Sequence, residues 1–222
     1  MSASSPTDMR SAAFRYGVVF AITFVLMVFA VIVPSGAGSR AVVVALELAA
    51  LLVVISTSRE RRSVRRARAA VVGAAGAAVV AGVAAGVLGP AFAFAVAGGL
   101  AIAVPAALVT GVLKLVRERG VTLQAIAGAL AIYLYVGLLF AWAIAFASAV
   151  EDARYFAQGG VSHGDRVYFS FTVLTTTGFG DLTPAHPVGH ALAVVEMLTG
   201  QLYLVTVIGV MIGNLVQARR RD

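Results

Sequence analysis

Residues 162–181, with the sequence SHGDRVYFSFTVLTTTGFGD, decide the fold that we expect for this chain. Ser162 followed by Asp165 is the pattern of a helix N-cap with an acid three residues on. The apolar side chains after it predict a short helix from about residue 163 to 175. The next residues, TTTGFGD, are not a helical sequence, and such backbone is tolerated at membrane depth only where protein buries it or water reaches it. We therefore expect a re-entrant element, which fills the region from Val150 to Pro187 between two membrane spans.

The rest of the chain has the composition of a membrane protein. Of its 222 residues, 60% are hydrophobic and only 12% are charged, which is far from the range of soluble domains. Apolar runs near 20 residues are long enough for a helix to cross a hydrocarbon core about 30 Å thick. The sequence predicts an all-α integral membrane protein with six transmembrane helices, at about 14–34, 40–57, 69–89, 91–113, 121–149 and 187–217.

The basic residues predict how these spans are oriented. If the N-terminus is cytoplasmic, the outside segments contain only Arg40, Arg154 and Arg166 of the 17 basic residues. The positive-inside rule then favours six spans with both termini in the cytoplasm, so the net charge of +7 reflects topology and not nucleic-acid binding. The inside segments contain the other 14: Arg10, Arg15, Arg59, Arg61, Arg62, Arg65, Arg66, Arg68, Lys114, Arg117, Arg119, Arg219, Arg220 and Arg221.

The first apolar run has an alternative interpretation as a signal peptide, because basic residues precede it. Its stretch from Tyr16 to Val33 is longer than the usual signal core, and its removal would break the alternation of charge. The chain has no cysteine, which excludes disulfides and thiolate metal sites.

The string Thr176, Thr177, Gly178, Phe179, Gly180 resembles the selectivity filter TVGYG of the potassium channel pore family, with Thr and Phe in place of Val and Tyr. The resemblance, which extends to small prokaryotic members, implies a homotetramer in a bacterial plasma membrane. It also implies that the carbonyls of residues 176–179 and the Thr176 hydroxyl coordinate potassium. The glycines permit backbone torsions that other residues adopt only with strain. Potassium is the bound species, and no other cofactor is expected.

The same resemblance suggests which residues support the filter. Tyr168 and Thr172 occupy the positions from which the family reaches the carboxylate that corresponds to Asp181. We expect a hydrogen bond from the Tyr168 hydroxyl to Asp181. The ring of Phe179 is expected to contact an apolar cuff that contains Phe169 and Val173.

The last apolar run resembles the inner helix of these channels. Glu196 is an acid within an apolar span, and it either braces the short helix by hydrogen bonds or is a protonated packing residue. Gly200 is at the family's hinge position, or it is a packing contact. An apolar stripe is expected to line the cavity and form a cytoplasmic constriction, unless it packs on the outer helix: Leu204, Ile208, Ile212 and Val216. Glu47 has no partner that the sequence identifies.

These patterns predict the domain organisation. We expect a disordered cytoplasmic tail (1–13), a four-helix peripheral membrane domain (14–113), a pore domain (121–217) and a basic cytoplasmic tail (218–222). Arginines recur at every third position from 59 to 68, as in a voltage sensor, but this segment is polar on all sides, so we expect no steep voltage dependence.

We therefore expect passive conduction of potassium, with membrane lipid as the surrounding partner. A potassium-uptake transporter, which carries four pore loops in one chain, and a non-conducting regulatory subunit remain alternatives. An enzyme is not expected, because the sequence has no cysteine, no clustered His and carboxylate set and no phosphate loop. The sequence does not indicate the gating stimulus.

Overall fold

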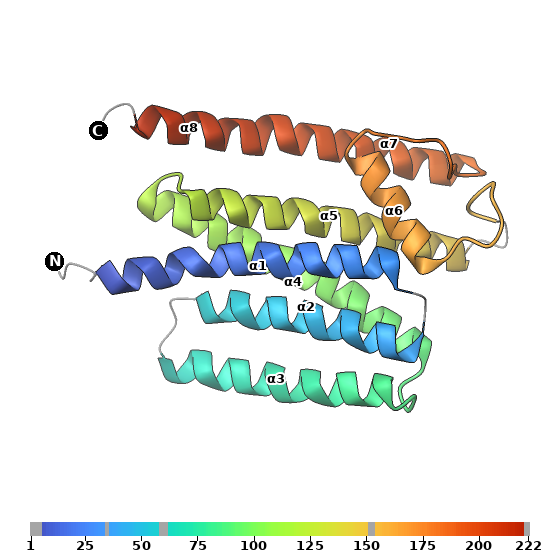
Figure 1. Cartoon of the computed structure of the whole chain (residues 1–222), viewed down its shortest axis with the longest axis horizontal. Coiled ribbons are helices and arrows are strands. Elements are labelled where there is room, and N and C mark those ends of the chain that lie inside the picture. The colour runs from blue at the N-terminus through green and yellow to red at the C-terminus, as the bar shows by residue number, and fades with distance from the viewer. Residues whose placement is uncertain (1–5, 34–35, 58–61, 151–153, 220–222) are drawn as a thin grey trace.

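The computed structural model describes residues 6–33, 36–57, 62–150 and 154–219, and these contain helices but no β-strand. Figure 1 shows long helices that run side by side, with one short helix, α6, set across them. The elements are α1 (Pro6–Ile32), α2 (Ala37–Thr57), α3 (Arg62–Ala84), α4 (Pro90–Arg119), α5 (Leu123–Val150), α6 (His163–Leu174), α7 (Pro187–Leu202), the π-helix η1 (Tyr203–Ile208) and α8 (Gly209–Arg219).

Four stretches of these helices are long and apolar enough to cross a membrane, namely Gly38–Ile55, Ala95–Arg119, Leu123–Ser148 and Pro187–Gln217. They coincide with four of the six runs that the sequence indicates. The other two runs are also helical, and within the described residues their apolar stretches are shorter, Tyr16–Ile32 and Ala69–Ala84. Six spans therefore remain a prediction.

Two helices begin earlier than the sequence suggests. Helix α1 begins at Pro6, so residues 6–13, which we expected in a disordered tail, are helical. Proline suits the first position of a helix, because the N–H that it lacks has no intrahelical partner there. Helix α3 begins at Arg62, within the arginine repeat whose side chains lie outside the described part of the structure.

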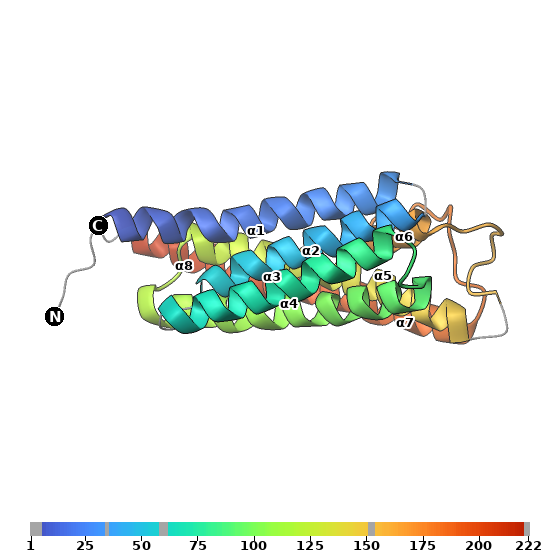
Figure 2. The same cartoon turned by 90° about the horizontal axis from the view of Figure 1, so that it is seen from below.

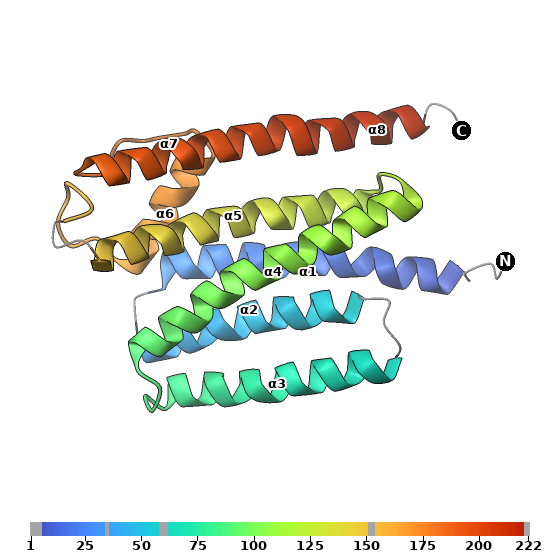
Figure 3. The same cartoon turned by 180° about the vertical axis from the view of Figure 1, so that it is seen from behind.

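Three of the first four helices, α1, α2 and α4, share one core with the pore half. Helix α5 packs on both α1 and α4, and α2 packs between α1 and α4. The shared core includes Val19 of α1, Leu108 of α4, Tyr135 of α5 and Val167 of α6. Helix α3 packs on α2 at the edge of the molecule (Figures 1 and 3).

The helix ends are segregated along the bundle. The start of α1, the end of α2, the start of α3, the end of α4 and the end of α8 lie at one end (Figures 1 and 2). The loops around α6 lie at the opposite end. Lys114, Arg117 and Arg119 near the end of α4 therefore lie at the end of the bundle where α1 begins and α8 ends, as the charge pattern predicts.

Candidate functional site

Two short stretches on either side of α6 are bonded together and close a loop. The Ala157 N–H donates to the Thr183 carbonyl at 2.9 Å, and the Ala185 N–H donates to the Tyr155 carbonyl at 2.8 Å. The Gln158 amide adds two bonds to Thr183, accepting from its N–H at 3.0 Å and donating to its hydroxyl at 3.2 Å. The chain between residues 158 and 183 therefore leaves one end of the bundle and returns to it.

Helix α6 begins with the predicted cap. The Ser162 hydroxyl accepts from the Asp165 N–H at 3.2 Å, and the Asp165 carboxylate accepts from the Ser162 N–H at 2.8 Å. These bonds from Ser162 lower the pKa of Asp165, because they favour its charged form. The helix, His163–Leu174, agrees with the predicted range to within one residue.

The start of α6 lies directly against α1. A Cβ atom added to Gly164 would lie 2.5 Å from the Val31 carbonyl oxygen, which is too close for any residue but glycine without a backbone shift. The end of α1 therefore fixes the position of α6.

The backbone after α6 alternates in handedness. Thr176, Gly178 and Gly180 have φ values of 57°, 52° and 81°, while Thr177 and Phe179 do not have positive φ. Thr176 is the only non-glycine residue with positive φ in the described chain. Alternating hands turns successive N–H groups toward the same side, as in backbone nests, so their carbonyls turn toward the other side. Such a segment can present a row of carbonyl oxygens to a cation.

Backbone hydrogen bonds also hold this segment against α6. The N–H groups of Thr177 and Gly178 both donate to the Thr172 carbonyl, at 2.8 and 3.1 Å. The Thr175 and Thr177 hydroxyls lie 2.9 Å apart, within hydrogen-bond range. Residues 175–181 are nevertheless exposed in the single chain, so any further cover has to come from outside it.

Phe179 is 69% exposed, and its ring stacks on that of Tyr168 with ring centroids 6.4 Å apart. The expected partners Phe169 and Val173 are instead buried in a cluster with Tyr155, because the face of α6 that carries them packs inward. Within the chain, the ring next to Phe179 is therefore that of a tyrosine. An apolar cuff formed with another subunit stays a prediction.

Desolvation and the nearby Asp181 carboxylate raise the pKa of the Tyr168 hydroxyl, which indicates that the two side chains lie near each other. The expected hydrogen bond between them stays a prediction. Thr172 takes a different role from the expected one. Its hydroxyl donates to the Phe169 carbonyl at 2.8 Å, since a threonine within a helix readily bonds to the preceding turn.

Glu196 of α7 is fully buried and contacts α6, as one of the two interpretations of this residue expected. Its carboxyl oxygen lies 2.5 Å from the Ser170 hydroxyl, which also lies 2.7 Å from the Gly137 carbonyl of α5. One hydroxyl has one proton to donate. Both contacts are satisfied together only if Glu196 carries a proton and donates it to Ser170, which then donates to Gly137. This chain of bonds joins α5, α6 and α7.

Gly200 packs against the end of α6. A Cβ atom on Gly200 would lie 2.1 Å from the Leu174 carbonyl oxygen and 3.0 Å from the Leu174 carbonyl carbon. The glycine is therefore a close packing contact, the alternative to a hinge. The irregular part of the helix is the π-helix that begins three residues later.

The four residues of the expected stripe on the last helix differ in exposure, and their place in a cavity stays a prediction. Leu204, Ile212 and Val216 are exposed, but Ile208 is buried in the shared core together with Met211. The i+4 spacing assumed a continuous α-helix, whereas the hydrogen bonds of a π-helix span five residues and change the register. The change turns Ile208 toward α5.

Several residues that hold this site together were not found from the sequence. Ser170, Gly137, Gly164 and the pair of Gln158 and Thr183 act through contacts between distant segments. A polar residue at 170 within the apolar surface of α6 was the one available signal.

One comparison with known proteins matches the part of the chain that contains this site. Residues 128–217, which extend from α5 into α8, match the family model described as "ion channel". Comparisons of the chain with curated proteins and with solved structures found no match. The family match covers α6, the exposed segment after it and Glu196, and it indicates an ion channel of the potassium-channel type.

Proposed function

We propose that this protein is a subunit of a homotetrameric, potassium-selective channel that conducts potassium passively across a bacterial plasma membrane. The observation that carries the proposal is the exposed segment Thr176–Gly180, whose backbone alternates in handedness after a capped helix. Four copies of this segment around one axis supply the rings of carbonyl oxygens that replace the hydration shell of potassium. Helix α6 is then a re-entrant pore helix, and its C-terminal end favours a cation beside it.

The open face of the last helix supports assembly with further copies. Val195, Leu198, Leu202 and Val205 recur at helical spacing and are 54–62% exposed. Helix α7 uses its other face to pack on α5 and α6, at the edge of the molecule (Figure 1). Exposed apolar side chains next to the filter segment fit an interface between subunits around the pore.

The proposed topology has six spans and cytoplasmic termini, with weak voltage dependence. The span Ala95–Arg119 precedes the pore half and carries its basic residues only near its end, at Lys114, Arg117 and Arg119. Moving one charge through 100 mV gives about 2.3 kcal/mol, and the middle of this span offers no charge to move. The single filter-like segment in the chain favours a channel over an uptake transporter with four such loops.

Flux and bilayer recordings with the purified protein in liposomes test the proposal. We expect a reversal potential that follows the potassium gradient when sodium replaces potassium on one side. Gly178→Ala should abolish flux, because alanine is strained at a φ of 52°. The matched control is Gly99→Ala, at a helical glycine with equally open space around it. Equal permeability to both ions would refute selectivity, and a folded tetramer without flux would favour the non-conducting alternative.

A further inference from the structure

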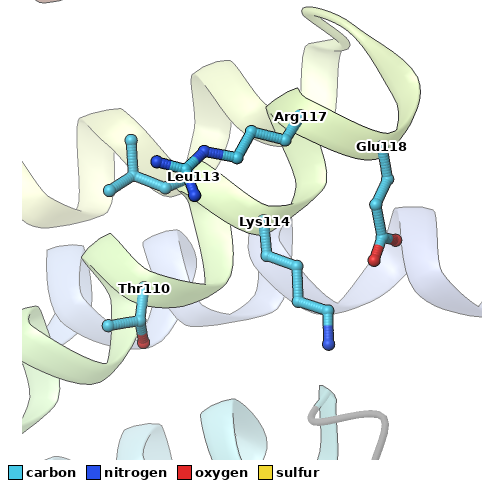
Figure 4. A pocket seen from close by; sticks show the side chains of 5 residues that line it. All are labelled: Thr110, Leu113, Lys114, Arg117 and Glu118. Atoms are coloured by element: carbon cyan, nitrogen blue, oxygen red, sulfur yellow. The ribbon is translucent and has the colours of Figure 1, made fainter.

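The end of α4 carries an open groove of about 440 Å³ that the pore does not use. Its described lining residues belong to the last turns of α4, which lie at the end of the bundle where α1 begins and α8 ends, opposite the loops around α6 (Figure 1). Figure 4 shows the side chains that line it, which come from the last three turns of the helix: Thr110, Leu113, Lys114, Arg117 and Glu118.

The described residues that line the groove carry two positive charges and one negative charge. Lys114 and Arg117 are exposed, and neither forms an ion pair with any other residue in the described part of the chain. Glu118 also lines the groove but has an interaction of its own within the protein. The carbonyl end of a helix carries partial negative charge and would repel an anion. Attraction for an anion therefore has to come from the Lys114 and Arg117 side chains.

An apolar stripe leads away from these two residues along the same face of α4. Ile102, Ala106, Val109 and Leu113 are all exposed and are spaced by four, three and four residues. Eleven residues of α-helix rise about 16 Å. Half of a hydrocarbon core is about 15 Å, so the stripe is as long as the acyl region of one leaflet.

We propose that this face of α4 binds an anionic phospholipid, with its acyl chain along Ile102–Leu113 and its phosphate between Lys114 and Arg117. Lys114 directly follows the last residue of the apolar stripe and Arg117 lies one turn beyond it, at the level where headgroups begin. The acyl stripe selects a lipid over free phosphate, and the two basic residues select an anionic headgroup over a zwitterionic one. The inference requires that the helices reside in a membrane, and it does not depend on potassium conduction.

Native mass spectrometry of the purified full-length protein, titrated with phosphatidylglycerol or phosphatidylcholine, tests the site. We expect tighter retention of phosphatidylglycerol by the wild type. The double variant Lys114→Gln, Arg117→Gln should bind it about thirtyfold more weakly, since each basic residue near the surface contributes about 1 kcal/mol. The matched control is Arg119→Gln, which removes an exposed charge from the same helix end outside the groove.

The thermal unfolding midpoint gives an independent readout. Phosphatidylglycerol should raise the midpoint of the wild type and of Arg119→Gln, but not that of the double variant. All three proteins should unfold at the same temperature in phosphatidylcholine alone, which shows that the exposed substitutions leave the fold intact. The proposal is overturned if Arg119→Gln loses as much affinity as the double variant, or if the double variant retains the lipid like the wild type. An equal rise in the midpoint with inorganic phosphate would overturn the choice of a lipid.

Discussion

Replacing Gly200 by alanine should destabilise the protein, although the same change in an open helix is favourable. The added Cβ atom would lie 2.1 Å from the Leu174 carbonyl oxygen, whereas ordinary contacts begin at 3.4 Å. Helix α7 or the end of α6 has to move by about 1.3 Å, the difference between these distances. Overpacking of this kind costs about 1–3 kcal/mol. We expect about 3 kcal/mol, because the two atoms nearest to the added Cβ, the Leu174 carbonyl oxygen and carbon, belong to the backbone. The higher helix propensity of alanine offsets about 1 kcal/mol of this cost.

The measurement is the thermal unfolding midpoint in detergent, with Gly73→Ala as the control. A Cβ atom on Gly73 meets nothing within 4 Å, so only the propensity gain of up to about 1 kcal/mol remains. The two variants should differ by about 3 kcal/mol, or roughly 6–12 °C for a chain of this length. A Gly200→Ala midpoint equal to or above that of Gly73→Ala would refute the packing role. Altered gating with unchanged stability would instead favour the hinge.

Three further predictions concern the support of the exposed segment. Ser170→Ala should lower the free energy of unfolding by about 1–3 kcal/mol, because it leaves the buried Glu196 without its partner. Glu196→Gln should lower it less, because an amide can still donate to Ser170. Equal losses of stability in the two variants would contradict the proposed chain of hydrogen bonds. The lowered pKa of Asp165 means that its ionised carboxylate stabilises the fold at pH values above the ordinary pKa of aspartate, and this stability is lost as pH falls through the lowered pKa. Asp165→Asn should therefore be less stable than the wild type at neutral pH, and the gap should shrink in acid. A gap that does not change with pH would argue against the cap. Tyr168→Phe removes the hydroxyl that is expected to bond to Asp181, and it should speed inactivation of potassium currents without loss of tetramer on native gels. Inactivation like that of the wild type would show that no such bond holds the segment.

The local elements of the pore half could be predicted because each depends on residues that are close in sequence. A cap needs only Ser162 and Asp165, three positions apart, and the φ values of Gly178 and Gly180 follow from the absence of a side chain. Four of the expected spans follow from hydrophobic length alone. The expected bond from Tyr168 to Asp181 rests on the spacing in a known family and stays a prediction.

Contacts between segments could not be predicted in this way. Hydrophobicity shows that a helix is buried but not which face it buries. Helix packing therefore determines the direction of Phe169, the burial of Ile208 and the role of Gly200. The π-helix changes the register of the last helix, and no local sequence pattern predicts it.

The sequence by itself determined that the chain is a helical membrane protein with one potassium-channel-like segment, because hydrophobic length, charge placement and glycine spacing are local properties. Only the tertiary structure decided how that segment is held. The bonds of Ser170 to Glu196 and Gly137, and the contact of Gly164 with α1, join residues between 26 and more than 130 positions apart. Their partners are selected by steric fit and by the need of buried polar groups for hydrogen bonds, which exist only once the helices have packed.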